Sequence, residues 1–142
     1  MEHNPFANFQ LEIPKERSET IKTYTKTGED TWEFSPFERQ VDFWYFCFCY
    51  AVMKKLDPVR DPNMSNITPA SILSNDDYRI SHIQLAYIGY HEIIDDIADH
   101  RKVFTFAIEM ANAGMLAVLT ILKDPDENPI WNLCEFIEKE IR

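Results

Sequence analysis

The sequence predicts an all-α protein: a small four- to five-helix bundle-like domain over residues 35–142, preceded over residues 1–34 by an N-terminal arm that is extended or forms a short hairpin. Three observations predict this fold. Apolar residues recur at three- and four-residue spacing, prolines and capping residues mark the ends of the apolar segments, and only three of the 142 residues are glycine. With 45% hydrophobic residues, the chain has enough apolar material for one compact core.

The N-terminal arm is polar and interrupted. Bulky and polar residues alternate from Thr23 to Phe34 around a Thr-Gly-Glu-Asp turn, and Gly28 permits the positive φ that a hairpin turn requires. A short hairpin and an extended arm lying on the domain both fit this pattern. The first twelve residues are expected to be disordered or docked onto another surface.

The first helix is predicted to begin at the capping box Ser35-Pro36-Phe37-Glu38, because its serine hydroxyl and glutamate carboxylate can satisfy free backbone N–H groups. The helix is expected to run to about Leu56, where Asp57-Pro58 ends it.

The segment over residues 57–74 contains three prolines and is predicted to be a loop with one helical turn at Pro69–Leu73. A second cap, Ser74-Asn75-Asp76-Asp77, opens a helix that reaches about Gly89. Gly89 suits the left-handed conformation that often follows a helix. A short turn over residues 90–94 comes next.

The longest helix is predicted over about Asp95–Lys123. Its first turn is acidic, which suits the positive end of a helix dipole, and its apolar residues recur so that one face is buried. Small residues on this helix allow a neighbouring helix to approach closely: Ala107, Ala111 and Gly114. Asp124-Pro125 ends the helix, and Asn128-Pro129 begins the last one.

Composition excludes several classes of function. A net charge of −10 repels phosphate backbones and anionic lipid, so direct binding to nucleic acid or to a membrane is not expected. The longest apolar run, Phe43–Met53, has eleven residues, whereas a bilayer span takes about 20. The three cysteines are odd in number and sparse, and the N-terminus lacks a signal peptide. These features predict a cytoplasmic protein.

The run Phe43–Met53 is the most unusual segment, because it contains six aromatic residues and no polar stripe. A helix that is apolar all round has to be enclosed, either as the central core helix of its own fold or by a partner. Because aromatic residues dominate interface energetics, one of its faces can bind another protein or a second copy of the chain. The predicted partner-binding residues are Trp44, Tyr45 and Phe48, together with Trp32 or Trp131.

Two cysteines within this run, Cys47 and Cys49, are interpreted as small hydrophobic residues. In a helix, positions i and i+2 point about 200° apart, so their thiols cannot share one ion. No second Cys/His pair stands at zinc-site spacing, and no bound cofactor is expected.

An acidic cluster from His91 to His100 provides the alternative hypothesis of a metal-dependent enzyme. On one continuous helix, Glu92, Asp96 and His100 would align at i, i+4 and i+8, where carboxylates and imidazole can ligate a metal or transfer protons. Di-metal bundles draw Glu-x-x-His pairs from two helices, however, and only one such region exists. Aspartates at a helix start are also ordinary partners of the helix dipole.

No glycine-rich phosphate loop, nucleophile elbow or His-Glu-x-x-His motif is present, and the basic residues are scattered. Acidic residues concentrate towards the C-terminus. They are expected to form a solvated surface. A second possibility is an acidic face that binds a basic partner or mimics DNA, as an inhibitor would.

Four segments carry a resemblance to a known family. Phe37–Phe46 runs into Lys54–Val59, and Ile83–Gly89 and Glu109–Leu116 follow as apolar helical patterns. They are similar to the first helix, the central glycine-ended helix and the Ala-Asn-x-Gly-Leu helix of the small Dnd system-associated proteins, which are encoded beside bacterial DNA-phosphorothioation and phage-defence genes. The resemblance implies a small helical accessory subunit of a defence or restriction complex, with no catalytic residues.

The leading hypothesis is therefore a non-enzymatic accessory or adaptor subunit of a bacterial anti-phage defence or restriction complex. It would act through its aromatic-rich helix on a larger nuclease or ATPase subunit, and its acidic surface would steer the association.

Overall fold

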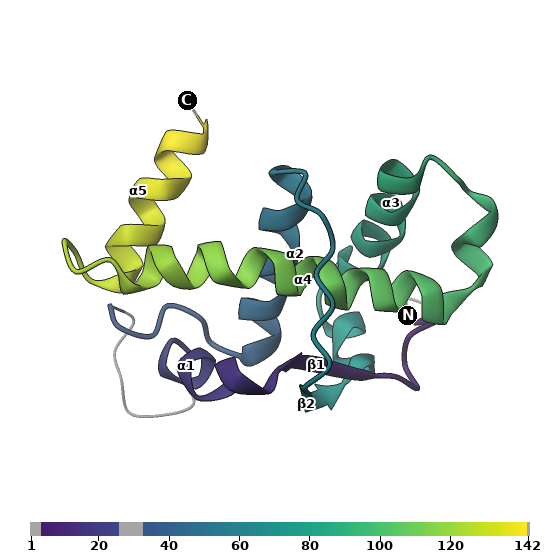
Figure 1. Cartoon of the computed structure of the whole chain (residues 1–142), viewed down its shortest axis with the longest axis horizontal. Coiled ribbons are helices and arrows are strands. Elements are labelled where there is room, and N and C mark those ends of the chain that lie inside the picture. Colours follow the sequence, from purple (N-terminus) through teal and green to yellow (C-terminus); the bar gives the residue numbers. More distant parts are fainter. Residues whose placement is uncertain (1–3, 26–32, 142) are drawn as a thin grey trace.

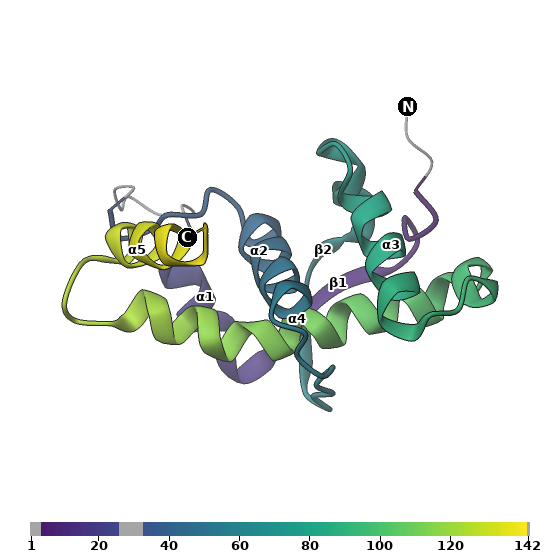
Figure 2. The same cartoon turned by 90° about the horizontal axis from the view of Figure 1, so that it is seen from above.

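The computed structural model describes residues 4–25 and 33–141 and shows a mostly helical fold with a small sheet. Helices make up 63% of it and strands 10%, so the prediction of a strictly all-α fold is wrong for the strands. The longest helix, α4 (His100–Lys123), crosses the molecule, and α5 (Pro129–Ile141), α2 (Gln40–Met53) and α3 (Arg79–His91) are arranged along it in that order (Figures 1 and 2). The other elements are β1 (Gln10–Pro14), η1 (Lys15–Arg17), α1 (Ser18–Thr23), β2 (Met64–Pro69), η2 (Ala70–Asn75) and η3 (Asp95–Ala98).

Helix α2 crosses α4 near the middle of both helices, at a point where their backbones come very close (Figure 1). A Cβ added to Gly114 of α4 would lie 2.1 Å from the carbonyl oxygen of Cys47 in α2. Only glycine therefore fits here. Ala107 and Ala111 are fully buried on the same helix, so the small residues have the role that their spacing predicts.

The apolar run of α2 forms the centre of the core. Phe43, Trp44 and Cys47 are fully buried, and Trp44 stacks on Phe48 with ring centroids 6.0 Å apart. The fold itself encloses this side of the helix, which confirms the core interpretation for these residues.

Residues 4–25 of the predicted N-terminal arm pack into the same core, and the expectation of an extended or hairpin arm is wrong for α1, which is helical. Phe6, Leu11 and Ile21 are fully buried. Strand β1 pairs with β2 in antiparallel register, with an irregularity between Leu11 and Glu12. The prediction that residues 57–74 form a loop is wrong for β2, and the helical turn predicted after it is present as η2. The hairpin predicted around Gly28 lies outside the described residues.

The helix caps predicted at two serines are wrong. Ser35 is buried and its hydroxyl donates to the carbonyl of Thr23, so α2 begins at Gln40 rather than within the predicted capping box. Likewise, the Ser74 hydroxyl donates to the Ser71 carbonyl, and α3 begins only at Arg79. In both places a side-chain to main-chain hydrogen bond replaces the predicted cap; the bond of Ser74 is local, whereas that of Ser35 reaches back twelve residues.

The end of α3 also differs from the prediction. The helix continues through Gly89, and the left-handed residue is Glu92, with φ of 57°. The predicted long helix is divided into η3 and α4, because the Asp99 carboxylate accepts from the Lys102 N–H and caps a new helix. The cap predicted for α5 is confirmed: the Asn128 side chain accepts from the Trp131 N–H.

Within the described residues, α4 is long and apolar enough to cross a membrane by length and composition alone. Of its most apolar stretch, 61% is buried inside the fold. The core helix of a folded domain has the same character, so this is weak evidence for a membrane span.

The crossing of α2 and α4 predicts opposite effects for two glycine substitutions. Gly114→Ala should lower the free energy of unfolding by about 2–3 kcal/mol, because the new methyl group overlaps the Cys47 backbone. Gly89→Ala is the matched control: it lies inside α3 with open space around its Cβ position, so it should raise stability by about 0.5–1 kcal/mol. Urea unfolding followed by circular dichroism measures both, and equal stabilities would contradict the close crossing.

Candidate functional site

An apolar groove of about 810 Å³ runs between α2 and α3, with α4 contributing to its lining. Three large apolar side chains of the groove are exposed to solvent: Leu85 (64%), Met53 (51%) and Tyr90 (43%). The other lining residues are Phe48, Cys49, Val52, Lys55, His82, Ala86, Gly89, Phe106 and Met110. Such a depression presents apolar area that no described part of the chain covers.

The sequence of α3 makes this groove. Ile80, Ile83 and Tyr87 are buried on the face that joins the core. Leu85 and Gly89, four residues apart, line the groove instead. Nothing lies within 4 Å of the position that a Cβ of Gly89 would occupy, so the groove is open at this point.

An ion-pair network fixes the start of α3 against the start of α2. Arg39 donates to Asp42 at 2.7 Å and to Asp76 at 2.9 Å, and Arg79 donates to Asp42 at 3.0 Å. Burial alone would raise the pKa of Asp42, but hydrogen bonds from Arg39 and Arg79 outweigh it and lower that pKa. The carboxylate at the centre of the network is therefore ionised at neutral pH.

Beside this network, Tyr45 of α2 joins the two helices. Its hydroxyl pairs with His82 Nδ1, and the Arg79 guanidinium lies 4.5 Å from the centre of its ring. Burial raises the pKa of Tyr45, so the hydroxyl is protonated at neutral pH. These contacts position His82 at the groove wall.

The lining of the groove contains few polar side chains. Apart from the hydroxyl of Tyr90, which donates to Asp57, the polar side chains of its lining are Cys49, Lys55 and His82. His82 is held by a phenol rather than by a carboxylate that would orient it as a base.

The predicted partner-binding aromatics are divided by the structure. Trp44 and Phe48 are 0% and 2% exposed, so the prediction that they are presented to a partner is wrong: neighbouring elements of the same chain cover them. Tyr45 is half-buried and engaged with His82. Trp131 is 55% exposed on α5, away from the groove, and Trp32 lies outside the described residues.

The predicted metal ligands do not converge. Glu92 ends α3, Asp96 lies in η3 and His100 begins α4, so the continuous helix that would align them does not exist. Hydrogen bonds from Lys102 and Tyr87 lower the pKa of Asp96, so this carboxylate already has partners. In the described part of the chain, no group of three or more His, Cys, Asp or Glu residues is placed to hold a metal ion.

The two cysteines of α2 differ in environment because their spacing points them apart, and the interpretation as small hydrophobic core residues is wrong for Cys49. Cys47 is fully buried against α4, and burial raises the pKa of its thiol, so it is an inert core residue. Cys49 is exposed and lines the groove.

Sequence reasoning missed the groove itself. The aromatic run of α2 drew attention to residues that proved to be core, whereas Leu85 was not among the predicted partner-binding residues. The usable signal was that Ile83, Leu85 and Tyr87 alternate, which in a helix places Leu85 on another face than its neighbours.

Comparison of the chain with models of protein families, with curated proteins and with solved structures gives no match. The argument about function therefore depends on the residues of this chain.

The ion-pair network predicts a pH dependence of stability. The pKa of Asp42 is lowered in the folded state, so its contribution is present above the ordinary carboxylate pKa near 4 and is lost as the pH falls through the folded-state value. Asp42→Asn should lower the free energy of unfolding by about 1–3 kcal/mol at pH 7 and reduce the loss of stability on acidification.

Urea unfolding at stepwise lower pH measures this difference. The control is Asp95→Asn, which removes an exposed carboxylate outside the network and should keep the wild-type pH profile. If Asp42→Asn and wild type lose stability in parallel from pH 5 downwards, the network does not act as described.

Proposed function

We propose that the protein is a non-enzymatic adaptor subunit that binds an amphipathic helix of a larger protein in the groove between α2 and α3. The observation that carries this proposal is the exposure of Leu85, Met53 and Tyr90 around one continuous apolar depression. Exposed apolar side chains are common singly, but a contiguous and concave set marks a binding surface.

A helix is the occupant that best fits the groove. Helix α3 has 13 residues, so one wall extends over about 20 Å, or between three and four helical turns. An amphipathic helix can insert apolar side chains spaced at i, i+3 or i+4, and i+7 into such a groove. Two helices form the walls, so the occupant would complete a three-helix arrangement.

The charge of the protein indicates the character of the partner. With a net charge of −10, the chain attracts basic segments over a range of roughly one Debye length, about 8 Å at physiological salt. The partner helix is therefore expected to carry Lys or Arg on its outward face. Its apolar face would supply the contact with Leu85 and Met53.

The resemblance to the Dnd system-associated proteins suggests where such a partner belongs. On that basis the proposed partner is a nuclease or ATPase subunit of a bacterial defence or restriction complex. The absence of converging catalytic groups in the groove supports an accessory role rather than an enzymatic one in the same complex.

The proposal predicts that Leu85→Glu abolishes partner binding. A buried, unpaired carboxylate in the middle of the interface would weaken the complex by at least about tenfold. The matched control is Leu116→Glu on α4, because Leu116 is 62% exposed and does not line the groove. Both variants should fold as the wild type does, because both side chains are largely in solvent.

The measurement has two stages. The tagged protein is cross-linked in its native host, and the cross-linked segment of the partner is then made as a peptide and titrated against the three proteins by calorimetry. Binding of an amphipathic, basic peptide to wild type and Leu116→Glu, but not to Leu85→Glu, supports the proposal. Equal binding to all three, or cross-links confined to surfaces outside the groove, contradicts it.

A further inference from the structure

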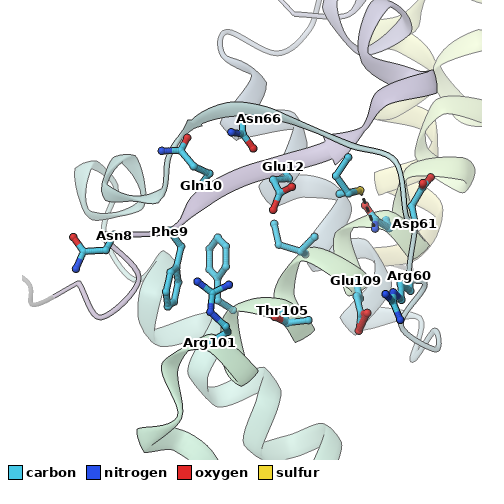
Figure 3. Close-up of a pocket in the computed structure, with 14 residues that line it drawn as sticks. Asn8, Phe9, Gln10, Glu12, Arg60, Asp61, Asn66, Arg101, Thr105 and Glu109 are labelled. Carbon is cyan, nitrogen blue, oxygen red and sulfur yellow. Dashed lines mark hydrogen bonds between the residues drawn. The ribbon is translucent and has the colours of Figure 1, made fainter.

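A second cleft lies between α4 and the β1–β2 ribbon, separate from the apolar groove. Its volume of about 420 Å³ falls within the range of small-ligand sites. Residues at helical spacing on α4 form one wall, and alternate residues of β1 and β2 form the other (Figure 3). In contrast to the groove, this cleft is lined mainly by charged and carboxamide side chains.

Asn112 is the side chain that points to a ligand. It lines the cleft and is only 7% exposed. Its Nδ2 donates to the Val59 carbonyl at 3.0 Å, but its Oδ1 is buried without a hydrogen-bond partner in the described part of the chain. Buried polar atoms are nearly always paired, so this acceptor is placed to receive a donor from a bound molecule.

Charged groups stand towards opposite ends of the cleft. The guanidinium of Arg101 lies 4.5 Å from the centre of the Phe9 ring, which holds it at one end. Glu109 lies one helical turn from Asn112, towards the other end, where Figure 3 also places Arg60 and Asp61. Along α4, Arg101 and Asn112 are separated by about 16 Å, at ~1.5 Å per residue. In the described ranges, neither Arg101 nor Glu109 forms an ion pair.

We propose that this cleft binds a short extended peptide with free termini, its carboxylate at Arg101 and its ammonium group at Asn112 and Glu109. A span of about 16 Å corresponds to four or five extended residues. The carboxamides of Asn8, Gln10 and Asn66 line the cleft and can pair with peptide N–H and C=O groups.

The remaining lining fits the same ligand. Phe104 and Ile108 give the α4 wall apolar contacts for the side chains of a peptide. Carboxylates of Glu12, Asp61 and Glu109 outnumber the two guanidinium groups, so a phosphate dianion is disfavoured and a zwitterion is accommodated.

The test uses the peptide Ala-Leu-Ala-Leu-Ala, whose alternate leucines can face the apolar wall, titrated against the full chain by calorimetry and NMR. The free peptide should bind saturably and shift the side-chain amide resonances of Asn112. N-acetylation and C-amidation should each weaken binding by at least about tenfold. Glu109→Gln should weaken binding of the free peptide but leave binding of the acetylated peptide unchanged. Arg101→Gln should weaken binding of the free peptide but leave binding of the amidated peptide unchanged.

The control is Lys123→Gln, which removes a positive charge from the far end of α4 without touching the cleft and should bind as the wild type does. Absence of saturable binding at millimolar peptide, with the Asn112 resonances unmoved, would mean that the acceptor holds only water and would overturn the proposal. Equal binding of free and capped peptides would overturn the assignment of the two ends. Leu85→Glu should bind this peptide normally, so failure here is distinguishable from failure at the groove.

Discussion

The close approach of α2 and α4 is the constraint on which the rest of the structure depends. Because Gly114 has no side chain, the backbone of Cys47 can rest directly on α4. The large residues Phe43, Trp44 and Phe48 of α2 are buried in the core that surrounds this crossing. An aromatic helix without a polar stripe thereby becomes the centre of a small core, and the fold requires no second protein to enclose Trp44.

This constraint also determines where apolar surface remains uncovered. Contacts of Arg79 with Asp42 and Tyr45 join α3 to α2 at one end, and residues of α4 line the groove between the two helices. The result is a groove walled by Leu85 on one side and Met53 on the other. The groove is already formed without an occupant, and a preformed groove binds at a lower entropic cost than one that must open.

Sequence patterns predicted the features that depend on a single element. The apolar stripe and small residues of α4 and the Asn128 cap of α5 follow from local spacing, and the structure has them. The β1–β2 ribbon was missed because it joins residues fifty or more positions apart, and no local pattern encodes that pairing. The helix cap predicted at Ser35 is wrong for a related reason: the Ser35 hydroxyl donates to the Thr23 carbonyl, which only folding brings near.

The two binding features lie on different flanks of α4, and this helix explains why both exist. Phe106 and Met110 are directed to the groove, whereas Arg101, Glu109 and Asn112 line the polar cleft. If Asn112 served only to stabilise the fold, its Nδ2 would be sufficient, because the hydrogen bond from Nδ2 to the Val59 carbonyl already joins Val59 to α4. A main-chain hydrogen bond already joins the same two segments, because the Val59 N–H donates to the Glu109 carbonyl. An apolar residue at position 112 would keep that bond and would not bury an unpaired acceptor. The unpaired Oδ1 is therefore the acceptor to which the proposed ligand would donate a hydrogen bond.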